Sequence, residues 1–187
     1  MPEQGATAVI DEIFALFARF GGRSYGEKLS LEDHMLQTAS HAALLGAQDS
    51  VVAAALLHDI GYFLHPDSET SIADGRDIGH ETLGAAWLSQ FFGGELTAPV
   101  ALHVEAKRYL CKVEPDYFDK LSDASRASLM LQGGAMTESE ATAFRQRPAF
   151  EAALLLRRAD DLGKNVGTRT LPLEHYRGLL TKFVRRS

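Results

Sequence analysis

The 187-residue sequence lacks the features that mark secreted and membrane proteins. Its only cysteine, Cys111, excludes an intrachain disulfide and fits a reducing compartment. The N-terminal segment has no basic start and carries acidic residues within its apolar stretch, so it does not resemble a signal peptide. No apolar run approaches the roughly 18 residues that a membrane span needs. We therefore expect a cytoplasmic protein with no membrane partner.

The sequence also lacks a basic cluster that could bind nucleic acid. The net charge is −6, with both signs interspersed, whereas phosphate backbones are bound by clustered Lys and Arg. The pair Arg185-Arg186 is too small a patch to change this conclusion. The apolar fraction of 45% is ordinary for a chain that buries a core, and the length favours one domain. We expect a monomer or a weak homodimer.

Apolar periodicity is helical almost throughout, without repeats, linkers or a convincing strand pattern. The first helix is predicted to end at Gly21-Gly22, and the polar segment 66–79 is predicted to be a loop. Caps, prolines and the restart of periodicity predict where the other helices begin. These starts are Ser30, Asp49 or Ser50, His80, Thr97, Ser122, Thr137, Pro148 and Pro172. The helix from His80 should reach Phe92, and the helix from Pro148 should reach Lys164. The sequence thus predicts an all-α bundle of about eight or nine helices.

The adjacent residues His58-Asp59 follow an apolar segment that is predicted to be a central helix. Burying a bare carboxylate there would cost on the order of several kcal/mol, unless a partner such as a metal ion compensates. One His-Asp pair is a weak signal by itself. The signal is strengthened by histidines on three other predicted helices and by a later aspartate, namely His34, His80, His103 and Asp160. Together these residues predict a metal site.

The order of these residues is that of the HD-domain superfamily, which the chain resembles as a single domain over residues 1–187. The segments SYGEKLSLEDHMLQTA, ALHVEAKRYL and LSDASRASLMLQGG carry the more specific resemblance. They are similar to the mixed-valent diiron oxygenases that cleave the C–P bond of hydroxyphosphonates, the PhnZ-like and TmpB-like group. The resemblance is also carried by three less specific segments, AALLHDIGY, DIGHE and LRRADDLGK. Myo-inositol oxygenase is a more distant relative with the same metal arrangement.

The resemblance implies two iron ions, Fe2+ and Fe3+, held by six side chains. These would be His34, His58 and Asp160 on the first iron, His80 and His103 on the second, and Asp59 bridging both. Asp160 is favoured over the neighbouring Asp161 because Lys164 follows it by four residues, as in the family pattern. Imidazoles and carboxylates would also accept manganese or zinc, so iron rests on the resemblance alone.

The resemblance also implies substrate contacts. Lys107, Ser125 and Gln132 would hold the phosphonate. A lid around Gly26 would place Tyr25 on an iron until substrate arrives, and would place Glu27 against the substrate's ammonium group. Tyr62 stands where relatives that process a primary amine have histidine, and its aromatic face suits a trimethylammonium group. Asp59, Tyr25 and Glu27 are thus the candidate catalytic residues, and Glu27 and Tyr62 would also bind substrate.

The expected partners are O2 and a small zwitterionic phosphonate. The expected substrate is 1-hydroxy-2-(trimethylammonio)ethylphosphonate, which would give phosphate and glycine betaine. The primary-amine analogue, which would give glycine, is a close alternative. The main rival function is an HD-domain metal-dependent phosphohydrolase of a nucleotide or other phosphate ester. A regulatory domain without catalysis and a polyol oxygenase are further alternatives. The lid loop with its sequence YGE and the segment SLMLQGG, residues 128–134, argue against hydrolysis.

Overall fold

The computed structural model describes residues 2–24, 27–66, 68, 70–71 and 74–185. The helices are α1 Pro2–Phe20, α2 Leu31–Leu44, α3 Asp49–Leu57, α4 Gly61–Leu64, α5 His80–Leu88, α6 Gly94–Val113, α7 Tyr117–Lys120, α8 Asp123–Leu131, α9 Glu138–Arg145, α10 Phe150–Leu162, the 3-10 helix η1 Leu173–Tyr176 and α11 Arg177–Phe183. α4 and α7 are single turns, which leaves nine longer α-helices within the described residues. The predicted all-α bundle is therefore confirmed. The described residues form no strand, only one isolated bridge between Phe92 and Val184.

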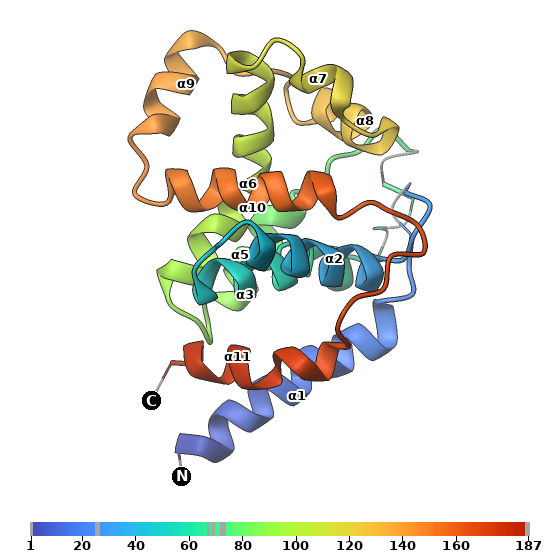
Figure 1. Ribbon diagram of the computed structural model, residues 1–187, viewed down its shortest axis with the longest axis vertical. Coiled ribbons are helices and arrows are strands. Elements are labelled where there is room, and N and C mark those ends of the chain that lie inside the picture. The colour runs from blue at the N-terminus through green and yellow to red at the C-terminus, as the bar shows by residue number, and fades with distance from the viewer. Residues whose placement is uncertain (1, 25–26, 67, 69, 72–73, 186–187) are drawn as a thin grey trace.

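The apolar helix α3 lies at the centre, packed against α2, α6 and α10 (Figure 1). Residues 53–57 of α3 are completely buried. α1 and α11 pack together at the end of the molecule that holds both termini (Figure 1). A second apolar cluster lies along the C-terminal half of α6, where α7, α8 and α9 cover it at the opposite end. The metal-site candidates therefore come from the helices around the central core.

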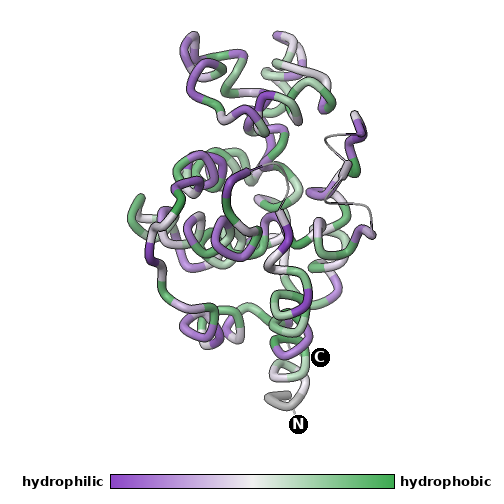
Figure 2. The backbone as a smooth tube through the Cα atoms, turned by 90° about the vertical axis from the view of Figure 1, so that its right-hand side faces the viewer, coloured by the Kyte–Doolittle hydropathy of each residue, from purple (hydrophilic) through white to green (hydrophobic). Residues whose placement is uncertain are grey.

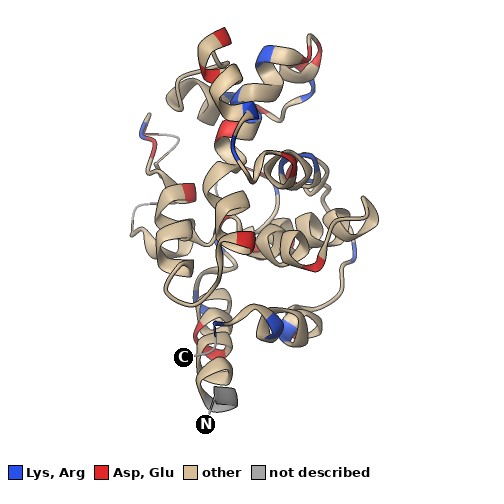
Figure 3. Ribbon diagram, turned by 90° about the vertical axis from the view of Figure 1, so that its left-hand side faces the viewer, with Lys and Arg blue, Asp and Glu red and all other residues tan. Residues whose placement is uncertain are grey.

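Hydrophobic and hydrophilic residues alternate along most helices, as amphipathic helices require (Figure 2). Acidic and basic residues are interspersed along the ribbon (Figure 3), in agreement with the mixed charge of the sequence. No helix in the described part of the chain has both the length and the apolar character needed to cross a membrane.

Three helix starts that a hydroxyl side chain caps were predicted correctly. The side chains of Ser30 and Ser122 cap α2 and α8, and Thr137 forms a capping box with Glu140 at α9. Four boundary predictions were wrong. α3 follows Gln48, with no side-chain cap from the two residues after it, and α5 ends at Leu88 instead of Phe92. α6 begins at Gly94, and α10 runs over Phe150–Leu162. Thr97 lies inside the first turn of α6, where its hydroxyl donates to the Gly93 carbonyl.

A tight turn joins α3 to α4 and carries the His-Asp pair. Ile60 N donates to Leu57 O, and Tyr62 N donates to Asp59 O, so each bond spans three residues. A Cβ atom on Gly61 would lie 1.9 Å from the carbonyl oxygen of His80. Only a residue without a side chain allows this approach. The turn thereby brings the first residue of α5 against His58 and Asp59.

Candidate metal centre

Six side chains from five segments converge around Asp59. They are His34 of α2, His58 and Asp59 of the turn after α3, His80 of α5, His103 of α6 and Asp160 of α10. Each of these residues is at most 5% exposed. All six were predicted from the sequence, and the structure brings all six together.

The two carboxylate oxygens of Asp59 face different pairs of histidines. Oδ2 lies 3.3 Å from His58 Nε2 and 3.5 Å from His34 Nε2. Oδ1 lies 3.3 Å from the Nε2 atom of His80 and 3.7 Å from that of His103. Asp160 adds its Oδ1 to the first group, 3.3 Å from the Nε2 atom of His34. The cluster therefore has two halves that share one carboxylate.

Main-chain carbonyls fix the orientation of three of the imidazoles. Nδ1 of His34 donates to Gly163 O, that of His58 to Ala55 O and that of His103 to Val100 O, at 2.7–2.9 Å. A carbonyl only accepts, so each Nδ1 carries a proton and each ring turns its Nε2 towards Asp59. The fourth ring, His80, instead has the Glu81 carboxylate 3.5 Å from its Nδ1.

These orientations bring ring nitrogens of neighbouring histidines close together. Nε2 of His34 lies 3.2 Å from Nε2 of His58, and both rings use their Nδ1 protons elsewhere. Burial and the neighbouring imidazoles His58 and His80 hold the pKa of His103 well below its usual value, which keeps that ring neutral. A cation between the rings would be bound by these nitrogens together with the Asp59 carboxylate. The donor set of neutral imidazoles and carboxylates fits divalent and trivalent transition metals.

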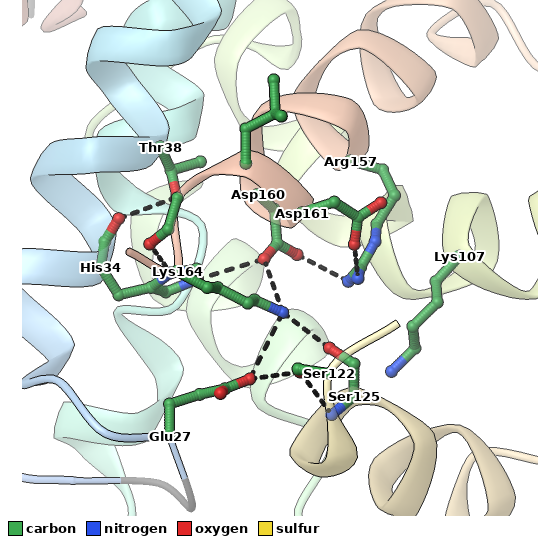
Figure 4. Close-up of polar contacts among 12 residues, drawn as sticks. Glu27, His34, Thr38, Lys107, Ser122, Ser125, Arg157, Asp160, Asp161 and Lys164 are labelled. Carbon is green, nitrogen blue, oxygen red and sulfur yellow. Dashed lines mark hydrogen bonds and ion pairs between the residues drawn. The ribbon is translucent and has the colours of Figure 1, made fainter. Parts of the chain in front are cut away.

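A cavity of about 30 Å³ borders the cluster, with cationic side chains along one side. Lys107 is 3% exposed, and its Nζ donates to Ser128 Oγ at 2.8 Å. Burial, together with nearby Arg157, lowers the pKa of Lys107 to about 7. Lys164 Nζ donates to Ser125 Oγ at 2.6 Å and lies 3.4 Å from Asp160 Oδ1 (Figure 4). Two serine-bound ammonium groups thus face the space beside the metal cluster.

The other predicted substrate residues lie at different places around the cluster. Tyr62 lines the cavity with one ring face stacked on His80, at a centroid distance of 4.3 Å. Gln132 lines a neighbouring cavity of about 10 Å³ that also touches Tyr62. Glu27 accepts a hydrogen bond from Ser122 and lies 3.7 Å from Lys164 Nζ (Figure 4). Tyr25, the predicted lid tyrosine, lies outside the described residues.

Three polar residues of this region were not predicted as site residues: Ser122, Ser128 and Arg157. Ser128 follows Ser125 by three residues on α8, and Arg157 precedes Asp160 by three on α10. This spacing places each pair on one helix face, which was the available signal. Lys164 was noted in the sequence only as a marker of Asp160, but the structure places its ammonium group in the cavity wall.

The family model of the HD domain matches residues 31–163, a range that includes all six clustered residues. The chain belongs to the HD-domain family. A hydroxymethylphosphonate dioxygenase of Gimesia maris is 44% identical over 170 residues, which cover 89% of this chain and 84% of the relative. A 1-hydroxy-2-(trimethylamino)ethylphosphonate dioxygenase of Leisingera caerulea, described as glycine-betaine-forming, is 38% identical over 94% of this chain and 90% of its own length. An uncharacterized protein of Acanthamoeba polyphaga mimivirus is 34% identical over 95% of this chain and 83% of its own length.

Proposed function

We propose that this HD-domain chain is a dioxygenase that cleaves the C–P bond of a small hydroxyphosphonate. The observation that carries the proposal is the Asp59 carboxylate, whose two oxygens face separate pairs of histidines, as a ligand bridging two metal ions must. Two relatives that nearly match the chain in length are named as dioxygenases of hydroxyphosphonates. The reaction requires O2 as the second substrate.

The predicted pair of irons fits the two halves of the cluster. His34, His58 and Asp160 with Asp59 Oδ2 would hold the first iron, and His80 and His103 with Asp59 Oδ1 the second. Bound iron would supply the redox chemistry that makes O2 reactive towards the substrate carbon. The second iron would have fewer protein ligands than the first, which would leave room for the substrate hydroxyl and phosphonate.

The chain's own residues bind the anion and exclude water. Lys107 and Lys164 present ammonium groups that are each held by a serine hydroxyl. Charge-assisted hydrogen bonds from two such donors suit a phosphonate dianion. The clustered histidines and aspartates are nearly inaccessible to solvent, so bulk water is kept from the reacting carbon. Gln132 and Ser125 remain proposed phosphonate contacts.

Two substrate types compete for this site. The trimethylammonio substrate, with its primary-amine analogue as a close alternative, needs a carboxylate for its cation, and Glu27 is the proposed partner. Hydroxymethylphosphonate, which would give formate and phosphate, has no cation. Two observations favour hydroxymethylphosphonate. The ammonium group of Lys164 lies 3.7 Å from the Glu27 carboxylate and already balances its charge, and the cavity is small. The substrate of the Gimesia maris relative makes hydroxymethylphosphonate a specific second candidate.

Phosphate release with and without O2 tests the proposed function. The iron-loaded protein is given each of the three hydroxyphosphonates, and a nucleotide monophosphate serves as the probe for hydrolysis. We expect phosphate from at least one hydroxyphosphonate in air and none under argon. Equal release under argon, or release from the nucleotide alone, would replace the proposal with a phosphohydrolase. His103→Ala should abolish release, whereas His175→Ala, a change at an exposed histidine, should not.

A further inference from the structure

Arg157 is a buried arginine, and each of its three guanidinium nitrogens donates a hydrogen bond. It is 3% exposed, and its NH1 donates to Asp160 Oδ2 at 2.6 Å. Its NH2 donates to Asp161 Oδ1, and its Nε donates to the Tyr117 hydroxyl at 3.0 Å. The same hydroxyl donates to Asp161 Oδ2 at 2.5 Å. Arg157, Asp161 and Tyr117 therefore form a closed ring of hydrogen bonds behind Asp160; the Arg157 contacts with both aspartates are visible in Figure 4.

The ring determines how Asp160 presents its carboxylate. Because Arg157 takes Oδ2, only Oδ1 points to the cluster, where it lies 3.3 Å from His34 Nε2. Arginine is suited to this task, since its planar fork can serve two carboxylates and a hydroxyl at fixed angles. Burial would lower the pKa of Arg157, but Asp160 and Asp161 outweigh it and hold that pKa well above its usual value. Arg157 therefore stays charged.

We propose that Tyr117 and Asp161 are positioning residues that fix Arg157, so that Asp160 offers a single oxygen to the first metal ion. The inference rests on the proposed function, because it requires a metal ion in that half of the cluster. It gives the two adjacent aspartates different tasks: Asp160 faces the metal, and Asp161 holds the arginine. It also makes α7, which supplies Tyr117, a support of the metal centre although no residue of α7 lines the cavity beside it.

Tyr117 holds Arg157 by a neutral hydrogen bond and Asp161 holds it by charge, so substitutions of the two residues remove different interactions. Tyr117→Phe keeps every charge and removes only the hydroxyl that links Arg157 Nε to Asp161 Oδ2. Asp161→Asn keeps the shape and removes the charge that balances Arg157. Arg157→Lys keeps the charge and loses the fork. The matched control is Glu114→Gln, which breaks the partly exposed ion pair with Arg158, the next residue on α10.

The test measures iron affinity by chelator competition and records the EPR spectrum of the Fe2+/Fe3+ state, alongside the melting temperature of the metal-free protein. We expect Tyr117→Phe, Asp161→Asn and Arg157→Lys to weaken iron binding about 10-fold or more and to change the EPR signal, as groups that orient metal ligands do. Glu114→Gln should match the wild type. Unchanged iron affinity and EPR in Tyr117→Phe and Asp161→Asn would overturn the inference, even if their melting temperatures fell.

Iron binding and hydroxyphosphonate cleavage by the wild-type protein show whether the positioning role alone is wrong or the proposed function as well. If it binds two irons and cleaves a hydroxyphosphonate while Tyr117→Phe and Asp161→Asn behave like the control, only the positioning role is wrong. If the wild type binds no iron, both proposals are overturned.

Discussion

Lys107 is a buried lysine whose charge the fold tolerates at a cost in stability. Its pKa is lowered from 10.5 to about 7, because burial removes water and Arg157 adds like charge. The unfolded chain therefore binds more protons than the folded one between about pH 7 and pH 10.5, and folding becomes more favourable as the pH rises through this window. Below pH 7 the full cost is present. A residue kept at such a cost is a candidate for function.

Lys107→Met should therefore stabilise the metal-free protein and impair binding. We expect a higher melting temperature at pH 7, with a gain over the wild type that shrinks towards pH 10.5. We also expect phosphonate affinity to fall about 10- to 100-fold, the usual effect of losing a charged hydrogen-bond donor. Calorimetry across this pH range and substrate titration provide both numbers. Unchanged affinity would rule out Lys107 as a phosphonate contact.

Tyr62 is the residue that distinguishes the substrate candidates. One face of its ring lies on His80, so recognition of a cation must use the rest of the side chain. Tyr62→His should shift the ratio of kcat/KM values towards the primary amine and away from the trimethylammonio substrate. Parallel assays with both phosphonates measure the shift. A ratio equal to that of the wild type would remove Tyr62 from the determinants of specificity.

The residues of the candidate metal site could be predicted from the sequence, whereas the contacts between distant side chains could not. The six clustered residues could be named because His and Asp are costly to bury without a cation, and because their order follows the HD pattern. The ring around Arg157 could not be predicted, since Tyr117 lies 40 residues away and meets Arg157 only in the folded chain, where α7 packs on α6. The ion pair between Glu27 and Lys164 likewise joins distant parts of the chain.

Helix identity could be predicted from periodicity, whereas helix ends depended on local chemistry. The starts of α2, α8 and α9 were located correctly, because a hydroxyl side chain that caps a helix satisfies its first backbone N–H groups whatever the tertiary context. α6 begins before the hydroxyl of Thr97, with Gly93 at its N-cap and a Glu95 carboxylate in its first turn. In the segment after α3, an apolar pattern that continues through a tight turn concealed the break that presents His58 and Asp59.

Gly61→Ala tests how closely α4 and α5 must approach. The added methyl group would lie 1.9 Å from the His80 carbonyl oxygen, so the start of α5 must move. We expect a loss of about 1–3 kcal/mol in unfolding free energy and weaker metal binding at His80 and His103. Denaturant unfolding and metal titration measure these effects. Gly178→Ala is the control, because the added carbon would meet no atom within 4 Å beyond its chain neighbours and the backbone of its own helix. It should be neutral or slightly stabilising.

The whole fold assembles the metal centre from residues that span positions 34 to 160. Because ligands this far apart meet only in the folded state, metal binding should add to folding stability. We expect removal of iron by a chelator to lower the melting temperature by about 5–10 °C, if free iron stood at about 100 times its dissociation constant. An unchanged melting temperature would mean that the cluster holds no ion under those conditions.

Three expectations for the whole molecule stay predictions. They are the cytoplasmic location, the single domain over residues 1–187 and the monomeric or weakly dimeric state.

Anomalous X-ray diffraction from crystals of the iron-loaded protein locates each metal ion and so tests whether Asp59 bridges two of them. We expect two iron peaks about 3.5–4 Å apart, one on each side of the Asp59 carboxylate. One peak near His34, His58 and Asp160, with His80 and His103 turned away from Asp59, would contradict this expectation.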